Sequence, residues 1–359
     1  MKWPAHGSNP QYVYQAMNLP MPTERMDYSA NINPLGPPSV IRERWGELSG
    51  LVTEYPDPYG AALKRKLSKA LEISERCILI GNGGSELISL LGRLLAGREA
   101  AIVQPSFTEY EEACRVNHCA VSYVQAEEGS WRWGEEDILL SIKRSDALFL
   151  CNPSNPTGVY YGRKDIVRLL MECRKYDCKL IIDEAFYDFL EEYESLVPLL
   201  KEFPQLIIIR SLTKMYAIPG LRLGYLLADE EVVSSLSKLQ PHWSVNALAL
   251  QAGEWCLDCE SHVQETQKAV SRERERLFQF YHSLNLLVSP SSTNYYLLRI
   301  PGLQDQFQFY EYLVKHGIIP RHSMNFKGIE GRWLRFAIRT EAENDRLMEA
   351  VEKWMNTTQ

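Results

Sequence analysis

The sequence predicts an α/β protein: a large domain with a mostly parallel sheet in an α/β/α sandwich, followed by a smaller α+β C-terminal domain. Between residues 78 and 228, short apolar runs alternate with polar or glycine-rich turns and longer amphipathic segments. This alternation is typical of parallel strands joined by right-handed helical crossovers. After about residue 240, shorter apolar runs alternate with helical segments, which indicates the second, smaller domain.

Each predicted strand of the large domain is an apolar run that ends at a turn. The runs are CILIG, AAIV, ALFL, KLIID and QLIIIR, at residues 77–81, 100–103, 147–150, 179–183 and 205–210. The motifs GNGGSE, PSFTEY, NPSNPTG, DEAF and SLTK follow these runs. Because the carboxyl ends of parallel strands form the ligand crevice of such sheets, we expect the five motifs to converge in space.

The chain divides into three predicted regions. Residues 1–45, rich in proline and asparagine, form an arm that contributes to the small domain and to the active site. Residues 46–240 form the large domain, and residues 241–359 form a linking helix and the small C-terminal domain. In this last region we predict helices at 265–284 and 344–355, and an alternation of short strands and helices through the segments 294–301, 310–321 and 332–340.

Composition excludes several classes of protein. The chain has 359 residues, of which 45% are hydrophobic and 24% charged, as is typical of globular domains. A formal charge of -7 disfavours a nucleic-acid partner. No apolar run reaches the roughly 20 residues of a membrane helix, and the N-terminal segment lacks the apolar core of a signal peptide. We therefore expect a cytoplasmic protein without a membrane or nucleic-acid partner.

Cysteine spacing gives no metal site. The eight cysteines are scattered, and the pair Cys256 and Cys259 lacks a second pair or a histidine partner at zinc spacing. We predict reduced thiols and no bound metal.

Lys214 is the first candidate for chemistry, because it follows an apolar strand instead of lying on a polar surface. Desolvation lowers the pKa of a lysine amine, and a neutral amine can form a Schiff base with an aldehyde. A surface lysine is the alternative.

Asp183 ends the apolar run KLIID, so its carboxylate is expected to be buried and to need a positive partner. One interpretation is that it pairs with the protonated pyridine nitrogen of pyridoxal phosphate, which keeps the ring an electron sink. A helix N-cap is the alternative.

A phosphate site is indicated by residues from two motifs. Gly84 and Ser85 of GNGGSE lie at a strand-to-helix turn, where backbone N–H groups favour an anion. Ser211 and Thr213 supply hydroxyl groups, and Arg222 supplies a guanidinium group suited to phosphate. A tight turn without a ligand is the alternative for the glycines.

Asn155 and Tyr110 complete the predicted cofactor site. Asn155, in the double Asn-Pro turn, is placed to direct its amide at a ring oxygen, although a pure turn role is possible for such residues. Tyr110 is predicted to stack on the ring face, with core packing as the alternative.

The ordered motifs GNG, F-x-x-Y, NPxNPTG, DEA, SLTK and GLRxGY resemble the fold-type I, class I/II aminotransferase superfamily, over nearly the whole chain. The resemblance implies pyridoxal 5'-phosphate as cofactor, with Lys214 as its covalent anchor and general acid/base. It also implies the roles given above for Asp183, Asn155 and Tyr110, and a homodimer with shared active sites. Tyr55 resembles the tyrosine that reaches the neighbouring subunit's cofactor phosphate; a Tyr-Pro turn is the alternative.

Two subfamilies share this layout, histidinol-phosphate aminotransferase and the threonine-phosphate decarboxylase of cobalamin biosynthesis. Both bind a small phosphorylated amino compound. Arg335 resembles the arginine for the substrate carboxylate and Arg321 the arginine for the substrate phosphate, with surface ion pairs as the alternative for both. The resemblance adds further substrate-binding residues near the N-terminus: His6, Gly7 and Asn31. Arg339 is added as a second arginine, because it lies on the same face as Arg335 if this segment is a strand.

The segments at 28–36, 215–225 and 241–249 are similar to the decarboxylase, and Phe186 stands where the aminotransferases usually have a tyrosine. The resemblance therefore implies decarboxylation of O-phospho-L-threonine, with histidinol-phosphate transamination as the alternative. A third hypothesis is a ligand sensor without catalysis, but the presence of both Lys214 and Asp183 disfavours it.

Overall fold

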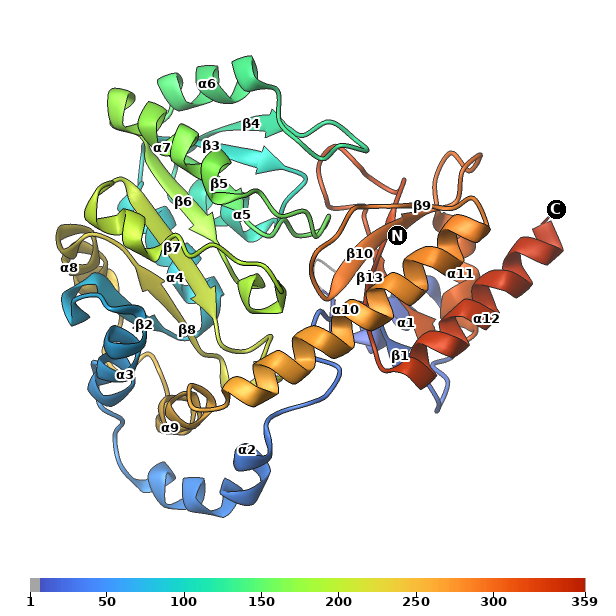
Figure 1. Cartoon of the computed structure of the whole chain (residues 1–359), viewed down its shortest axis with the longest axis horizontal. Helices are drawn as coiled ribbons and strands as arrows, with labels where there is room; N and C mark the ends of the chain where they lie inside the picture. Colours follow the sequence, from blue (N-terminus) through green and yellow to red (C-terminus); the bar gives the residue numbers. More distant parts are fainter. Residues whose placement is uncertain (1–6, 359) are drawn as a thin grey trace.

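The computed structural model describes residues 7–358 and shows two parts joined by one long helix (Figure 1). The large part contains a seven-stranded sheet and the small part a four-stranded one. A third, two-stranded sheet joins the N-terminal segment to the small part. The strands are β1 Met26–Asp27, β2 Ile78–Gly81, β3 Glu99–Gln104, β4 Ala120–Gln125, β5 Ala147–Cys151, β6 Lys179–Asp183, β7 Leu206–Ser211, β8 Gly224–Leu227, β9 Leu287–Val288, β10 Tyr295–Arg299, β11 Ile318–Ile319, β12 Arg321–His322 and β13 Leu334–Ala337.

Helices connect most of these strands. The α-helices are α1 Pro10–Met17, α2 Ser39–Glu43, α3 Ala61–Leu71, α4 Gly83–Leu94, α5 Glu109–Val116, α6 Glu135–Arg144, α7 Arg163–Tyr176, α8 Glu230–Leu239, α9 Ala247–Cys256, α10 Glu260–Ser283, α11 Phe307–Lys315 and α12 Glu341–Thr358. Among residues 7–358, no helix is both long and apolar enough to span a bilayer.

The large sheet has the strand order β2-β8-β7-β6-β5-β3-β4. All neighbouring pairs are parallel except those of β8, which runs antiparallel to both β2 and β7. The predicted α/β class with a mostly parallel sheet is confirmed. The reversed strand β8 is the part of the sheet that sequence alternation did not reveal, because a short apolar run does not disclose its direction.

Side chains that alternate along each central strand build a separate core on each face of the sheet. In β6, Leu180 and Ile182 belong to the core that includes α6 and α7, whereas Ile181 belongs to the core under α4, α5 and α8. Since both faces are covered, every residue of β5 and β7 is buried, as is typical of parallel sheets. The carboxyl ends of these strands are thereby held rigidly at one edge of the sheet.

Helices α4 and α5 pack closely because α4 has a glycine at their contact. A Cβ atom on Gly92 would lie 2.5 Å from the carbonyl oxygen of Ala113 in α5. We expect Gly92→Ala to lower the free energy of unfolding by about 1–3 kcal/mol, because overpacking of the backbone contact outweighs the better helix propensity of alanine. Chemical denaturation would measure the change.

Gly46→Ala is the matched control, because nothing lies within 4 Å of a Cβ atom at that position. The control is expected to change the free energy of unfolding by no more than about 0.5 kcal/mol. Equal stability of the two variants would contradict the close helix contact.

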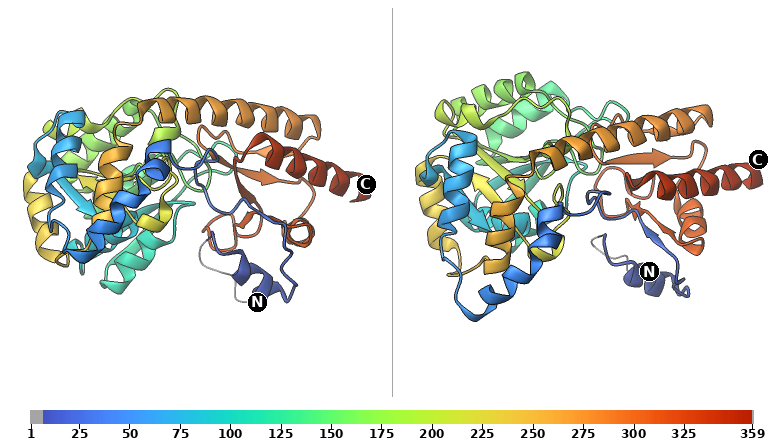
Figure 2. Two further views of the ribbon diagram at one scale, coloured as in Figure 1. Left: turned by 90° about the horizontal axis from the view of Figure 1, so that it is seen from below. Right: turned by 60° about the horizontal axis from the view of Figure 1, so that its bottom comes forward.

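The small part is an antiparallel sheet of order β12-β13-β10-β9, covered by α10 and α12 (Figure 1). Helix α10 has 24 residues and extends from the large part to the small part. The N-terminal segment returns to the small part, where β1 pairs in parallel with β11, with Met26 opposite Ile318. Figure 2 shows α1 and β1 lying beside these C-terminal elements.

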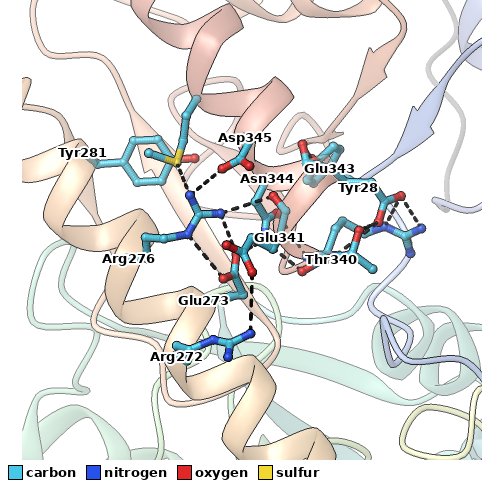
Figure 3. A network of polar contacts seen from close by, with 12 residues as sticks. Tyr28, Arg272, Glu273, Arg276, Tyr281, Thr340, Glu341, Glu343, Asn344 and Asp345 are labelled. Carbon is cyan, nitrogen blue, oxygen red and sulfur yellow. Dashed lines mark hydrogen bonds and ion pairs between the residues drawn. The ribbon is translucent and has the colours of Figure 1, made fainter.

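A polar network fastens α12 to α10 (Figure 3). Arg276 of α10 donates to Glu273 at 2.8 Å and to Asp345 of α12 at 2.6 Å. Asn344 donates to Glu273 at 2.9 Å, and Tyr28 of the N-terminal segment donates to the carbonyl oxygen of Glu343 at 2.6 Å. The network fixes the chain that leaves β13, and with it the position of that strand.

Candidate active site

A cavity of about 270 Å³ lies where the carboxyl ends of β3, β5, β6 and β7 meet the N-terminal segment and the small part. The motifs after the strands converge here, as the parallel sheet requires. The predicted site residues that line it are Gly7, Asn31, Gly84, Ser85, Tyr110, Asn155, Asp183, Ser211, Thr213, Lys214, Arg222, Arg321 and Arg335.

Lys214 extends into this cavity from the turn that follows β7. Burial lowers the pKa of its amine to about 8, and the positive charges of Arg222 and Arg335 act in the same direction. The amine is therefore about half unprotonated near pH 8, where an exposed lysine is almost fully charged. The N-terminal segment holds the lysine turn in place, because Asn33 donates its N–H to the carbonyl oxygen of Lys214 at 3.1 Å and its side-chain amide to that of Met215 at 2.7 Å.

Asp183 lies at the end of β6 with its carboxylate almost fully buried. Its Oδ2 accepts a hydrogen bond from the hydroxyl of Tyr110 at 2.6 Å, and its Oδ1 accepts one from the N–H of Ala185 at 2.9 Å. Burial raises the pKa of Asp183, while the two hydrogen bonds and the charge of Lys214 oppose this rise. The carboxylate is thus held in one orientation, facing a cavity that contains a lysine amine.

The predicted stacking role of Tyr110 is wrong. Its ring is 1% exposed and stacks on Phe149 of β5, with 5.6 Å between ring centroids, and its hydroxyl is bound to Asp183. Phe107, three residues earlier, lines the cavity and meets Tyr110 edge-on. Both aromatic residues belong to the F-x-x-Y motif. Its spacing alone does not determine which ring packs in the core between the sheet and its helices and which ring lines the cavity.

An anion cradle is formed by the start of α4 and the turns after β7. Gly84 and Ser85 occupy the first turn of α4, whose N–H groups have no partner within the helix. The hydroxyl groups of Ser211 and Thr213 lie 2.8 Å apart and both line the cavity. The guanidinium of Arg222 packs against the same helix start, since a Cβ atom on Gly83 would lie 2.6 Å from its Nη2. Helix N-terminus, hydroxyl groups and guanidinium together suit a phosphate group.

Two buried arginines approach the cavity from the small part. Nη1 of Arg335 donates to Oδ1 of Asn155 at 2.6 Å, and Nη2 donates to the carbonyl oxygen of Ser29 at 2.6 Å. Arg321 donates to Asn325 at 2.7 Å. Burial lowers the pKa of Arg335 to about 9, helped by the charge of Arg321, and burial lowers that of Arg321 to about 10. No carboxylate within residues 7–358 lies at ion-pair distance from Arg335.

The N-terminal segment closes one side of the cavity. His6 lies outside the residues that the structure describes. Gly7 lines the cavity, and a Cβ atom there would lie 2.4 Å from the carbonyl oxygen of Ser29. Asn31 is buried, and in the described part of the chain its Oδ1 has no hydrogen-bond partner. This orphaned acceptor and the unpaired Nε of Arg335 mark a site that is incomplete without a ligand.

Two predicted residues do not line the cavity. Arg339 pairs with Glu343 at 2.8 Å, and its prediction as a substrate residue is wrong because β13 ends at Ala337, so strand alternation does not carry past that point. Tyr55 is 82% exposed and lies against Trp243, with 5.0 Å between ring centroids. Its predicted contact with a neighbouring subunit stays a prediction.

Sequence reasoning missed several lining residues, among them Ser29, Phe107, Glu109, Asn325 and Phe326. Ser29 lies inside the segment YSANINPLG, but its contribution is a backbone carbonyl, which no residue type reveals. In residues 7–358, no group of three or more histidine, cysteine, aspartate or glutamate side chains is arranged to hold a metal ion.

Comparison with known proteins agrees with this arrangement. The family described as aminotransferase class I and II matches residues 23–351. The threonine-phosphate decarboxylase of Salmonella typhimurium is 35% identical over 97% of this chain and 95% of its own length. The adenosylcobalamin biosynthesis bifunctional protein CobDQ of Leptospira interrogans is 31% identical over 98% of this chain, which spans 41% of that protein.

A solved structure confirms the fold. The histidinol-phosphate aminotransferase from Clostridium acetobutylicum superposes with a TM-score of 0.87 and 29% identity, over 92% of this chain and 99% of its own. The sequence match over most of the chain and the shared fold both lead to one conclusion. The chain belongs to the class I and II aminotransferase family.

Proposed function

We propose that this protein decarboxylates O-phospho-L-threonine, with pyridoxal 5'-phosphate as cofactor, to give (R)-1-amino-2-propanol O-2-phosphate and CO2. The observation that carries the proposal is the pair of buried arginines, Arg321 and Arg335, facing the same cavity as Lys214. Two guanidinium groups suit a substrate with a phosphate and a carboxylate. The 35% identity to a threonine-phosphate decarboxylase supports the same substrate class.

The residues present fit pyridoxal phosphate. The anion cradle of Gly84, Ser85, Ser211, Thr213 and Arg222 would hold its phosphate. Asp183 would pair with the ring nitrogen, and Nδ2 of Asn155, which has no partner within residues 7–358, would donate to the ring oxygen. When bound, the cofactor supplies an electron sink for the bond that breaks at the substrate Cα.

The chain's own groups then perform three tasks. Arg321 would bind the substrate phosphate and Arg335 the carboxylate, with Gly7 and Asn31 closing the cavity around them. The predicted substrate residue His6 lies outside the described residues. Because both anions are held, the substituents on the substrate Cα are oriented before any bond breaks. The bond between Cα and the carboxylate carbon breaks, CO2 leaves, and the ammonium group of Lys214 supplies the proton that replaces it on Cα.

Phe186 supports decarboxylation over transamination as a mark of the subfamily. Its ring lies in the cavity wall, 5.9 Å from Nζ of Lys214 and 4.8 Å from the ring of Tyr295. A phenylalanine offers no hydroxyl to the cofactor ring oxygen, so that oxygen depends on Asn155. The second candidate is histidinol-phosphate aminotransferase, which the solved structure with a TM-score of 0.87 favours.

A turnover assay distinguishes the two candidates. The purified protein is loaded with pyridoxal 5'-phosphate and given either O-phospho-L-threonine or L-histidinol phosphate with 2-oxoglutarate. We expect release of CO2 from the first substrate. Glutamate formation from the second pair without CO2 release from the first would replace the proposal by the aminotransferase. The first outcome would place the reaction in cobalamin biosynthesis, to which the name of the Leptospira relative refers.

The corrected places of Phe107 and Tyr110 give a paired prediction. Phe107→Leu is expected to weaken binding of pyridoxal 5'-phosphate by about 1 kcal/mol, through loss of aromatic contact. Tyr110→Phe removes a hydrogen bond that lowers the pKa of Asp183, so that pKa rises further. As the pH is lowered, Tyr110→Phe should therefore lose cofactor binding at a higher pH than wild type does, whereas Phe107→Leu should lose it at the wild-type pH. Measuring cofactor affinity as a function of pH tests both effects. If Phe107→Leu also shifted the pH at which affinity is lost, the roles given to Phe107 and Tyr110 would be contradicted.

We also propose a homodimer in which Tyr55 contacts the cofactor phosphate of the other subunit. Trp243, whose ring contacts Tyr55, is exposed, and so are the large apolar side chains nearby along the chain, namely Trp45, Val52 and Tyr59. Clusters of this kind favour a protein contact. Light scattering should give twice the chain mass, and a monomeric holoenzyme with full activity would contradict the shared site.

We place the protein in the cytoplasm. All eight cysteines are free thiols, and six of them are buried, which suits a reducing compartment.

A further inference from the structure

A buried ion pair lies directly behind the turns that carry Asp183 and Lys214. Nε of Arg210 donates to Oε2 of Glu184 at 2.9 Å, and the two side chains are 2% and 0% exposed. Nη2 of Arg210 donates to the hydroxyl of Tyr193 at 2.8 Å. That hydroxyl in turn lies 2.9 Å and 3.1 Å from the two carboxylate oxygens of Glu184. The three side chains form a closed ring of hydrogen bonds, which we call the clasp.

An aromatic ring fixes the clasp from one side. The guanidinium carbon of Arg210 lies 3.9 Å from the ring centroid of Tyr187, and the rings of Tyr187 and Tyr193 are 5.1 Å apart. Burial acts to lower the pKa of Arg210, but Tyr187 and Glu184 raise it well above its ordinary value, so the guanidinium stays protonated. The hydrogen bonds to Glu184 and Tyr193 therefore restrain the guanidinium within its plane, and the ring of Tyr187 restrains it perpendicular to that plane.

The clasp and the cavity lie on opposite faces of the same two strands. Neighbouring residues of a strand point to opposite faces. Asp183, Ile209 and Ser211 line the cavity, whereas Glu184 and Arg210 follow or precede them by one residue. The N–H of Glu184 also donates to the carbonyl oxygen of Ile209 at 2.8 Å, which closes the contact between the ends of β6 and β7.

A buried ion pair of this kind adds little to the free energy of unfolding. Removing two charges from water costs about as much as their attraction returns, and apolar side chains of similar volume often serve as well or better. What a forked guanidinium and a carboxylate supply, and apolar contacts do not, is a fixed direction and distance. The clasp joins the strand end that carries Asp183 to the strand end that leads into Lys214.

We propose that Glu184, Arg210 and Tyr193 are positioning residues, which set the distance and orientation between the Asp183 carboxylate and the Lys214 amine. The inference rests on the proposed function, since it assumes that these two groups hold one cofactor between them. It gives a task to the glutamate of DEAF and to the arginine before SLTK, neither of which touches the cavity.

The experiment separates positioning from stability with an apolar replacement. In the double variant Glu184→Leu with Arg210→Met, similar volume is kept and the charges are removed together. A structural role predicts an unchanged unfolding midpoint and an unchanged cofactor site. A positioning role predicts an unchanged unfolding midpoint of the cofactor-free protein, but weaker affinity for pyridoxal 5'-phosphate by about tenfold, as expected for coupled residues of one network. It also predicts a shift of about one pH unit in the absorbance titration of cofactor bound to Lys214.

The pair Glu273 and Arg276 on α10 is the matched control, because it is also hydrogen-bonded (Figure 3) and partly buried, but neither residue lines the cavity. Glu273→Gln is expected to lower the unfolding midpoint and to leave cofactor affinity and the absorbance titration at their wild-type values.

Two single variants cover the case in which the double variant does not fold. Arg210→Lys keeps the charge without the fork, and Tyr193→Phe removes only the shared hydroxyl. We expect both to shift the absorbance titration in the same direction, by less than the double variant. If a folded clasp variant kept the wild-type cofactor affinity and the wild-type absorbance titration, the positioning role would be overturned, while the proposed function would still stand. A wild-type protein that shows no absorbance from cofactor on Lys214 would overturn the proposed function, and this inference with it.

Discussion

Replacing Lys214 by alanine is expected to reduce turnover of O-phospho-L-threonine by at least about 10³-fold. The residue is assigned both the covalent hold on the cofactor and the proton transfer to Cα, and loss of a general acid/base alone costs about 10²–10⁴-fold. The variant should bind pyridoxal 5'-phosphate through the anion cradle without a covalent bond. Borohydride reduction followed by mass measurement of the denatured chain would show the cofactor attached to wild type and absent from the variant.

The lowered pKa of Lys214 adds a pH dependence to this prediction. Its value of about 8 lies below that of an exposed lysine because the amine is buried. The amine attacks an aldehyde only in its neutral form, so the rate at which cofactor attaches should rise with pH up to about 8 and then level off. Stopped-flow absorbance on the cofactor-free protein measures this rate.

Lys238→Ala is the control, because this lysine is exposed on α8 and lies outside the cavity. It should keep wild-type attachment and turnover. Turnover of Lys214→Ala within tenfold of wild type would contradict the assignment of the lysine, and with it the proposed reaction.

Replacing Arg335 by methionine is expected to reduce kcat/KM by about 10²–10³-fold without loss of stability. The guanidinium is buried, and within residues 7–358 its hydrogen bonds go only to an amide oxygen and a carbonyl oxygen, so we expect it to pair with an anion when substrate binds. Removing one member of a buried hydrogen-bonded charge pair costs about 2–5 kcal/mol of binding energy. The unliganded protein, in contrast, loses a desolvated charge, and its free energy of unfolding should stay equal or rise.

Steady-state kinetics and chemical denaturation test the two halves of this prediction. Arg335→Lys should recover only part of the activity, because an ammonium group does not reproduce the fork. Arg339→Met is a matched control four residues further along the chain: it loses a partly exposed ion pair with Glu343, worth about 0–1 kcal/mol, and should keep nearly full activity. A strong activity loss in Arg339→Met, with a mild one in Arg335→Met, would reverse the assignment of the two arginines.

Those features of the site that depend on strand ends could be predicted from the sequence. Asp183 and Lys214 each follow an apolar run, and parallel strands bring such positions to one edge. Features that depend on the exact residue at which a strand stops could not be predicted. Arg339 would share the face of Arg335 only if strand alternation continued two residues past the end of β13, and the sequence contains no clear stop at Ala337.

Backbone contributions and rotations within a turn were also beyond the sequence. Phe107 and Tyr110 are both aromatic and three residues apart, and only the turn into α5 decides which ring lies under the sheet. The bond from Arg335 to the carbonyl oxygen of Ser29 joins segments that no local pattern connects. The reversed strand β8 depends likewise on a chain direction that apolar content does not encode.

The pairing of β1 with β11 also has a consequence for how the protein is made. Met26 and Ser29 leave the ribosome long before their partners, which are β11 for Met26 and Arg335 for the carbonyl oxygen of Ser29. Closing so long a loop is entropically slow, and exposed strand edges invite aggregation meanwhile. A nascent chain should therefore complete the large sheet first and acquire its arm last, so that a chain truncated before residue 318 would be compact yet unable to hold substrate.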